Sequence, residues 1–171
     1  MKKFLKVLLI LFFTSSLYSQ STLEEYFYAG VAKYKFKDHY GAIADYTKAI
    51  ELDTSYTNAY HNRGLAKNKL KDYYGAIADY SKAIELDPNY TYAYNNRGLA
   101  KNKLKDYYGA IADFTKAIEL DPNYTNAYNN RGLAKDKLKD YYNAISDYNK
   151  VIELDPNYTY AYNNRGVSKW H

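Results

Sequence analysis

The stretch YNNRGLAKNKLKDYYGAIADFTKAIELDPNY, residues 94–124, returns almost unchanged as YNNRGLAKDKLKDYYNAISDYNKVIELDPNY over residues 128–158. Sliding the chain against itself by 34 residues superposes nearly everything after Leu23. A fixed period of this length indicates a repeat architecture, in which each unit buries its apolar side against its neighbours. The period predicts four full blocks and one incomplete block: residues 23–56, 57–90, 91–124, 125–158 and 159–171.

Each block carries the pattern of two short amphipathic helices. In the block of residues 57–90, Tyr60, Gly64 and Lys67 recur three to four residues apart, and the same spacing connects Ala76, Ile77, Tyr80, Ala83 and Ile84 further on. This is the spacing of one helix face. Each block is therefore predicted to be a helix pair.

Short polar segments separate the helices. Lys71-Asp72 predicts a tight turn, with Asp72 capping the second helix. That helix is expected to end at Asp87-Pro88-Asn89, because proline cannot continue it. Thr91 is placed to cap the first helix of the next block.

The pattern resembles the tetratricopeptide repeat (TPR), whose aromatic, glycine, alanine, aromatic and proline positions are met at Tyr60, Gly64, Ala76, Tyr80 and Pro88. The positions recur as Tyr94, Gly98, Ala110, Phe114 and Pro122, and as Tyr128, Gly132, Ala144, Tyr148 and Pro156. Glycine and alanine there allow two helices to approach closely.

Two positions depart from the TPR pattern. Arginine occupies its leucine position at Arg63, Arg97, Arg131 and Arg165, and lysine occupies its tyrosine position at Lys67, Lys101 and Lys135. The first block also has Thr54 in place of proline. These departures leave the details of packing open.

The resemblance implies an all-α fold, an α-solenoid that winds as a right-handed superhelix, with a concave groove lined by the first helix of each pair. A protein or peptide ligand is expected there, because amides both donate and accept backbone hydrogen bonds and leucine and tyrosine add apolar contact. The alternative is a solvated groove without a ligand. The groove residues implied by the resemblance are Asn58, His61, Leu65, Asn68, Lys69, Tyr92, Asn95, Leu99, Asn102, Lys103, Asn126, Asn129, Leu133, Asp136 and Lys137.

Some TPR proteins bind acidic C-terminal tails through a clamp of lysines, asparagines and an arginine, and the match to that clamp is poor. Asn62, Asn96 and Asn130 fit its middle asparagine. Its lysine position, however, holds Phe27, His61, Asn95 or Asn129, and its second asparagine position holds Val31, Leu65, Leu99 or Leu133.

The arginines favour a ladder of ion pairs between blocks. The first block has Ala29 where the others have arginine, so pairs within each block would leave Asp45 and Arg165 alone. Joining each aspartate to the arginine 18 residues later uses all eight residues and predicts Asp45–Arg63, Asp79–Arg97, Asp113–Arg131 and Asp147–Arg165. Solvated charges with unrelated partners are the alternative.

The N-terminus has the layout of a secretory signal peptide: three lysines, an apolar run from Leu5 to Phe13, then small polar residues. Cleavage is expected after Ser19, which leaves residues 20–22 as a linker and an exported mature chain. The apolar run is shorter than the roughly 20 residues of a membrane-spanning helix. An uncleaved N-terminal anchor is the alternative.

Composition excludes several classes of site. With no cysteine, the chain has no disulfide and no thiolate metal site. The net charge of +5 falls to about +2 without the leader, and lysine alternates with acidic residues, which disfavours a nucleic-acid partner. The three histidines form no metal or catalytic pattern, so neither a cofactor nor an enzymatic activity is expected.

The last block holds only a first helix, expected from Tyr160 to Lys169. It is expected to cap the array imperfectly. The alternative functional reading is a truncated remnant, or the interaction segment of a longer protein that carries an effector domain.

Overall fold

The computed structural model describes residues 22–170, and every regular element in that range is a helix. The predicted leader, residues 1–19, and the linker up to Ser21 lie outside the described residues. In chain order the helices are a first helix over 22–35, α2 (His39–Leu52), α3 (Thr57–Lys69), α4 (Tyr73–Leu86), α5 (Thr91–Lys103), α6 (Tyr107–Leu120), α7 (Thr125–Lys137), α8 (Tyr141–Leu154) and α9 (Thr159–Lys169).

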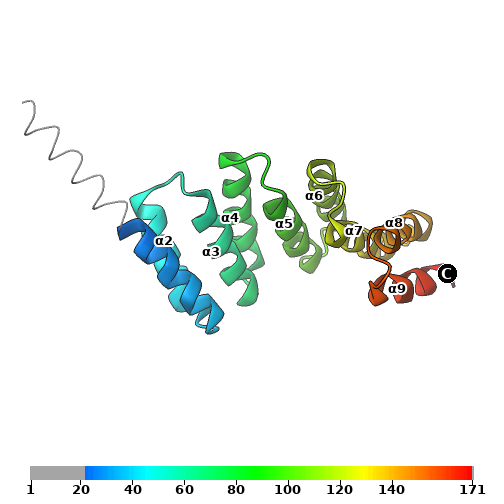
Figure 1. Ribbon diagram of the computed structural model, residues 1–171, viewed down its shortest axis with the longest axis horizontal. Helices are drawn as coiled ribbons and strands as arrows, with labels where there is room; N and C mark the ends of the chain where they lie inside the picture. Colours follow the sequence, from blue (N-terminus) through cyan, green and yellow to red (C-terminus); the bar gives the residue numbers. More distant parts are fainter. Residues whose placement is uncertain (1–21, 171) are drawn as a thin grey trace, which may run out of the picture.

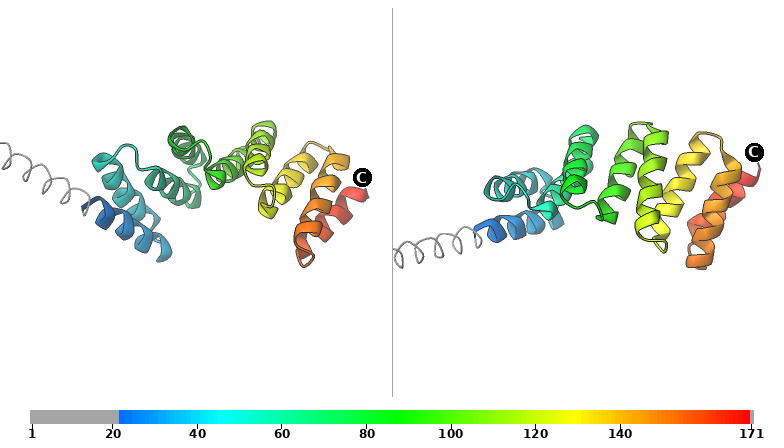
Figure 2. Two further views of the ribbon diagram at one scale, coloured as in Figure 1. Left: turned by 45° about the horizontal axis from the view of Figure 1, so that its top comes forward. Right: turned by 90° about the horizontal axis from the view of Figure 1, so that it is seen from above.

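The helices stack in a row as consecutive antiparallel hairpins (Figure 1). Helix α3 packs on α4, α5 on α6 and α7 on α8, while α4 meets α5, α6 meets α7 and α8 meets α9. Neighbouring first helices also touch, α3 with α5, α5 with α7 and α7 with α9. Each hairpin is rotated relative to the one before it (Figure 2). The expected all-α solenoid is confirmed.

Lysine in the left-handed conformation turns the chain from the first helix of a hairpin into the second. Lys71 has φ 64°, its N–H donates to the carbonyl of Asn68, and the N–H of Asp72 donates to the carbonyl of Lys67 at 3.0 Å. These two bonds form a Schellman motif. The same positive φ recurs at Lys37, Lys105 and Lys139.

The Asp72 carboxylate then caps α4, accepting a hydrogen bond from the N–H of Gly75 at 2.9 Å. This confirms the predicted N-cap. Asp38 and Asp106 do the same in their own turns. Asp140 does not cap α8. Asn143 replaces the glycine there, and its side-chain amide donates to the Asp140 carboxylate instead.

The turn between hairpins differs from its prediction. Helix α4 ends at Leu86 with Asp87 and Pro88 following, as expected. Thr91, however, is the first residue of α5 and not its cap; the N-cap is Tyr90, without a side-chain hydrogen bond. The Asp87 carboxylate accepts from the N–H of Asn89, and Thr91 Oγ1 donates to the carbonyl of Asn89. The threonine hydroxyl therefore closes the turn instead of capping the helix.

The core consists mainly of alanines and one aromatic ring in each of the four hairpins, together with Ile50 and Val151. The ring of Tyr80 is fully buried with Ala76 and Ala100, and it lies over Gly64. A Cβ at Gly64 would lie 2.7 Å from Cε1 of Tyr80, closer than carbon atoms pack. The glycine of the repeat is therefore required by the helix–helix contact. No helix in residues 22–170 has the length and apolar character needed to cross a bilayer.

Candidate functional site

Most of the predicted groove residues keep an accessible side chain. Those on α3, α5 and α7 that are exposed are Asn58, Lys69, Tyr92, Lys103, Asn126 and Lys137. Those that are half-buried are Leu65, Asn68, Leu99, Asn102, Leu133 and Asp136. The first helices thus present amides, ammonium groups and the edges of leucines at a regular interval along the array.

Three predicted groove residues are buried instead. The side chains of His61, Asn95 and Asn129 are at most 8% exposed. Asn130 Nδ2 donates to Asn95 Oδ1 at 3.0 Å, and the corresponding contact joins Asn96 Nδ2 to His61 Nε2 at 2.9 Å. The third rung, from Asn164 to Asn129, is longer at 3.4 Å. These residues connect adjacent first helices, so the prediction that they face a ligand is wrong.

Asn58 and Asn126, near the N-terminal ends of α3 and α7, also contact the tyrosine that caps the next first helix. The hydroxyl of Tyr90 donates to Asn58 Oδ1 at 3.2 Å, and that of Tyr158 donates to Asn126 Oδ1 at 3.4 Å. Tyr92 packs edge-on to Tyr124, with ring centroids 5.6 Å apart. These contacts therefore connect the N-terminal ends of consecutive first helices.

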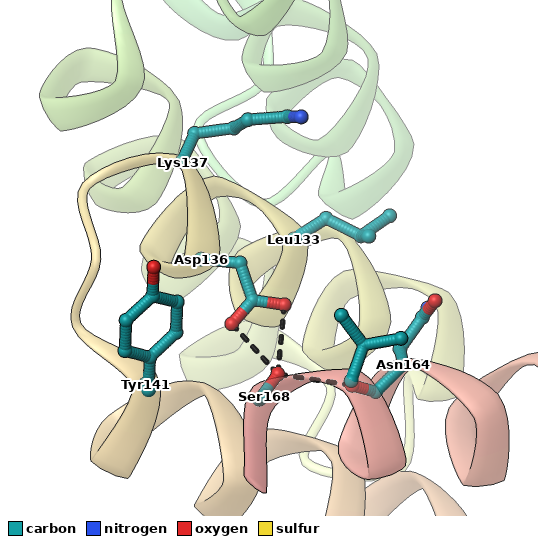
Figure 3. Close-up of a pocket in the computed structure, with 7 residues that line it drawn as sticks. Leu133, Asp136, Lys137, Tyr141, Asn164 and Ser168 are labelled. Atoms are coloured by element: carbon teal, nitrogen blue, oxygen red, sulfur yellow. Dashed lines mark hydrogen bonds between the residues drawn. The ribbon is translucent and has the colours of Figure 1, made fainter. Parts of the chain in front are cut away.

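A cavity of about 290 Å³ lies between α7, α9 and the start of α8 (Figure 3). Three of the predicted groove residues, Leu133, Asp136 and Lys137, line it. The sequence prediction missed its other lining residues, which are Tyr141, Asn164, Val167 and Ser168. The chain does carry a signal for them, because Ser168 stands where the earlier repeats have alanine.

A hydrogen-bond network closes the floor of this cavity. Ser168 Oγ donates to the Asp136 carboxylate, at 2.8 Å from Oδ1, and the Tyr148 hydroxyl donates to Oδ2 at 2.7 Å. Burial raises the pKa of Tyr148, and the bond to Asp136 raises it further. The tyrosine therefore stays protonated as a donor to the carboxylate at neutral pH.

The predicted ladder of ion pairs between repeats is wrong. Each of the first three arginines pairs with the aspartate 16 residues ahead of it, in its own repeat: Arg63–Asp79 at 2.7 Å, Arg97–Asp113 at 2.6 Å and Arg131–Asp147 at 2.7 Å. In each pair Nε and Nη2 bind the two carboxylate oxygens, the bidentate geometry typical of arginine.

The two end residues that motivated the ladder have other partners. Asp45 pairs with Lys33 at 2.7 Å, and Arg165 donates to the side-chain oxygen of Asn149 at 2.8 Å. The counting argument failed because it admitted only arginine and aspartate as partners. Contact between repeats exists, but its acceptors are uncharged hydroxyl groups: Nη1 of Arg97 donates to Ser81, and Nη1 of Arg63 donates to Thr47.

The two departures from the TPR pattern meet at these aspartates. Lys101 Nζ lies 2.8 Å from Asp113 Oδ2, so the carboxylate is shared by Arg97 and Lys101. Asp79 and Asp147 have the same pair of cations in their own repeats. Arginine at the leucine position and lysine at the tyrosine position thus form one three-charge cluster. Each arginine also lies over a tyrosine of its own helix, for example Arg97 over Tyr94 at 5.5 Å.

The role of this three-charge cluster is structural, because its carboxylate is not available to a ligand. The Asp113 side chain is 5% exposed, and both of its oxygens are occupied by cations. A buried, fully paired carboxylate of this kind specifies geometry, while its net contribution to stability is modest. Within residues 22–170, no three histidine, aspartate or glutamate side chains are grouped to hold a metal ion.

Comparison with known proteins agrees with the fold. The sequence model of the tetratricopeptide repeat matches residues 57–90, 91–124 and 125–158. The chain is a solenoid of helical hairpins, and it belongs to the tetratricopeptide repeat family. No curated protein matches it in sequence.

Solved structures of TPR proteins resemble it closely. MamA superposes with a TM-score of 0.82 at 28% identity, over 87% of this chain and 81% of MamA. YrrB, described as a TPR protein with an unusual peptide-binding site, has a TM-score of 0.74 at 25% identity, over 88% and 81%. The first TPR of Spaghetti (RPAP3), bound to the HSP90 peptide SRMEEVD, has a TM-score of 0.67 at 31% identity, over 69% and 94%.

Proposed function

We propose that this protein is an exported scaffold that binds an extended peptide across its first helices. The observation that carries the proposal is the regular series of accessible side chains on α3, α5 and α7, in which an asparagine or aspartate, a lysine and a leucine recur once per repeat. A peptide backbone offers donors and acceptors at short, regular intervals, which such a surface can match.

Two similar structures support a peptide as the ligand. One was solved with an HSP90 peptide bound, and the other is described by its unusual peptide-binding site. The carboxylate clamp is not the basis for the proposal, because the positions of its lysine and second asparagine hold other residues here. We therefore expect recognition through amides and leucine edges, without a requirement for an acidic C-terminus.

Export is part of the proposal and rests on residues 1–19, whose lysines, apolar run and small polar residues have the order of a signal peptide. Expression of the full chain in a secreting host tests it. The expected product begins at Gln20 in the extracytoplasmic fraction, as read by intact mass. A chain that keeps Met1 and stays in the cytoplasm would contradict export and leave the binding proposal standing.

The binding proposal is tested by capture followed by mutation. The chain from Gln20 onward is used as bait, bound proteins are identified by mass spectrometry, and the shortest binding peptide is then measured by calorimetry. The variant Tyr92→Ala/Lys103→Ala removes two exposed side chains from α5. We expect it to raise the Kd of that peptide at least tenfold.

The matched control removes the same two residue types from the second helix of the same repeat. Tyr108 and Lys116 are exposed on α6, and Tyr108→Ala/Lys116→Ala is expected to leave the Kd unchanged. A larger loss of affinity from the α6 variant than from the α5 variant would place the ligand on the second helices. That result would overturn the proposal.

A further inference from the structure

The cavity beside α9 lies where the repeats stop being identical. The position of Asp136 is asparagine in the two preceding repeats, at Asn68 and Asn102. The position of Ser168 is alanine in every earlier repeat. The two replacements are 32 residues apart in the chain, and their side chains are hydrogen-bonded to each other. They therefore build one local feature that the other repeats lack.

Asp136 differs from the interior aspartates in its electrostatics. Asp79, Asp113 and Asp147 each have a lysine and an arginine within 2.8 Å. Within residues 22–170 no cation forms an ion pair with Asp136; its oxygens accept only from hydroxyl groups. Lys137 lines the same cavity, but its ammonium group points away from the carboxylate (Figure 3).

A half-buried carboxylate without a cation can still form an ion pair. Hydroxyl donors orient the group and stabilise its charge, and they leave oxygen lone pairs that face the cavity. An ammonium or guanidinium group placed there forms a charge-assisted hydrogen bond, about twice as strong as a neutral one. The electrostatics of the cavity therefore favour a cationic guest.

The shape of the cavity selects a cation on an alkyl stem. Leu133 and Val167 contribute apolar walls, and the Asn164 amide lies at the rim. The volume of about 290 Å³ is at the lower end for ligand pockets, which run from roughly 300 to 1,000 Å³. One long side chain fits such a space better than a larger ligand does.

We infer that this cavity binds the side chain of a lysine or arginine in the guest peptide, with Asp136 as its counter-ion, and thereby fixes the register of that peptide on the array. The inference rests on the proposed function for the peptide and on the cavity for the cation. Nearly identical repeats offer a peptide several equivalent positions one repeat apart. A single carboxylate at one end removes that equivalence, because only one register places the basic residue against it.

The pocket itself is tested with small probes, which makes the result independent of any peptide. Acetyl-lysine methylamide, acetyl-arginine methylamide and the neutral acetyl-norleucine methylamide are titrated separately into the ¹⁵N-labelled chain from Gln20 onward. We expect the two cationic probes to shift the amide signals of Val167 and Ser168, and the norleucine probe to bind at least tenfold more weakly. Comparing the first two probes decides between an ammonium and a guanidinium guest.

Asp136→Asn is the matched variant, because asparagine is the natural residue at this position in the second and third repeats. It is expected to fold with an unchanged circular dichroism spectrum and to lose at least tenfold in affinity for the cationic probes. Equal binding of lysine and norleucine probes, or full binding by Asp136→Asn, would overturn the inference. Failure of the proposed function looks different: the cationic probes bind as expected, but no peptide is captured.

Transplantation provides the gain-of-function test. In the second repeat Tyr80 already supplies a buried hydroxyl that has no hydrogen-bond partner, so Asn68→Asp/Ala100→Ser recreates the whole network between α3 and α5. We expect the stoichiometry of the cationic probes to rise from one to two, with new shifts at Leu99 and Ala100. A folded double variant that still binds one probe per chain would show that the carboxylate and its two hydroxyl donors do not make the site.

Discussion

Arg97 binds Asp113 of its own repeat at 2.6 Å, and only its remaining nitrogen reaches the preceding repeat, at Ser81. The carboxylate is thus paired with cations inside the hairpin, while the bond between hairpins runs from the guanidinium to a neutral hydroxyl. Removing the carboxylate leaves two cations, Arg97 and Lys101, beside each other in a half-buried site.

We therefore expect Asp113→Asn to lower the free energy of unfolding by about 3 kcal/mol, the usual cost of breaking a buried ion pair on one side. Asp45→Asn is the comparison, since among residues 22–170 the one ion pair of Asp45 is with Lys33, whose side chain is 43% exposed. Its expected cost is about 1 kcal/mol. Urea titration of both variants measures the difference; equal losses would contradict the role given to the three-charge cluster.

The buried histidine makes stability depend on pH. Burial lowers the pKa of His61 from 6.5 to about 4. The folded chain therefore resists protonation, while the unfolded chain takes up the proton near pH 6.5. The contribution of the neutral ring is fully present above pH 6.5 and is lost as the pH falls towards 4.

His61→Asn is the control for that loss, because asparagine at Asn95 and Asn129 makes the same contact with the next repeat. Relative to this variant, the wild-type chain is expected to lose about 2 kcal/mol between pH 7.5 and 4.5, as measured by urea unfolding at several pH values. Parallel pH profiles for the two chains would show that the imidazole is accessible to protons in the folded state.

Two glycines at equivalent positions are expected to respond in opposite directions. A Cβ at Gly98 would lie 2.7 Å from Cε1 of Phe114, so Gly98→Ala forces the helices apart and is expected to cost about 1–3 kcal/mol. Nothing lies within 4 Å of the corresponding point at Gly166. Gly166→Ala is expected to stabilise α9 by about 0.5–1 kcal/mol through helix propensity. Thermal unfolding of both variants tests the contrast.

The lysines of the turns hold a backbone conformation that glycine adopts without strain. Lys105 has φ 64°, and replacing it with glycine is expected to raise the free energy of unfolding by about 0.5–1 kcal/mol. Lys103→Gly, two residues earlier and at the last helical residue of α5, should instead lower the free energy of unfolding. Chemical denaturation of the pair checks the sign, and a loss in both variants would mean that the lysine side chain contributes to the turn.

The helix pairs could be predicted from the sequence because the residues that define them are close together in the chain. The spacing of Ala76, Tyr80 and Ala83 and the positions of Asp72 and Pro88 each concern residues within a turn or two of one another. The partners of Arg63 could not be found in the same way. Whether it reaches Asp45 behind it or Asp79 ahead of it depends on the rotation between hairpins, which is a property of side-chain packing and not of spacing.

The same limit applies to the groove. Asn95 and Asn102 are both asparagines on α5, but the first is 4% exposed and bonded to the next repeat, and the second is half-buried. A residue's position on a helix face does not reveal how closely the neighbouring first helix approaches it. The pairing of Asp136 with Ser168 left a trace in the sequence, as two departures from the repeat, but their contact required the structure.

The pairing of each buried aspartate inside its own hairpin has a consequence for how such a chain changes over generations. A 34-residue unit contains its own aspartate, arginine and lysine. Its arginine needs only an uncharged acceptor from the preceding unit, such as Thr47 or Ser81. Recombination that inserts or deletes one unit therefore leaves no buried aspartate without a cation. The number of hairpins can therefore change while each buried aspartate keeps the cations of its own hairpin.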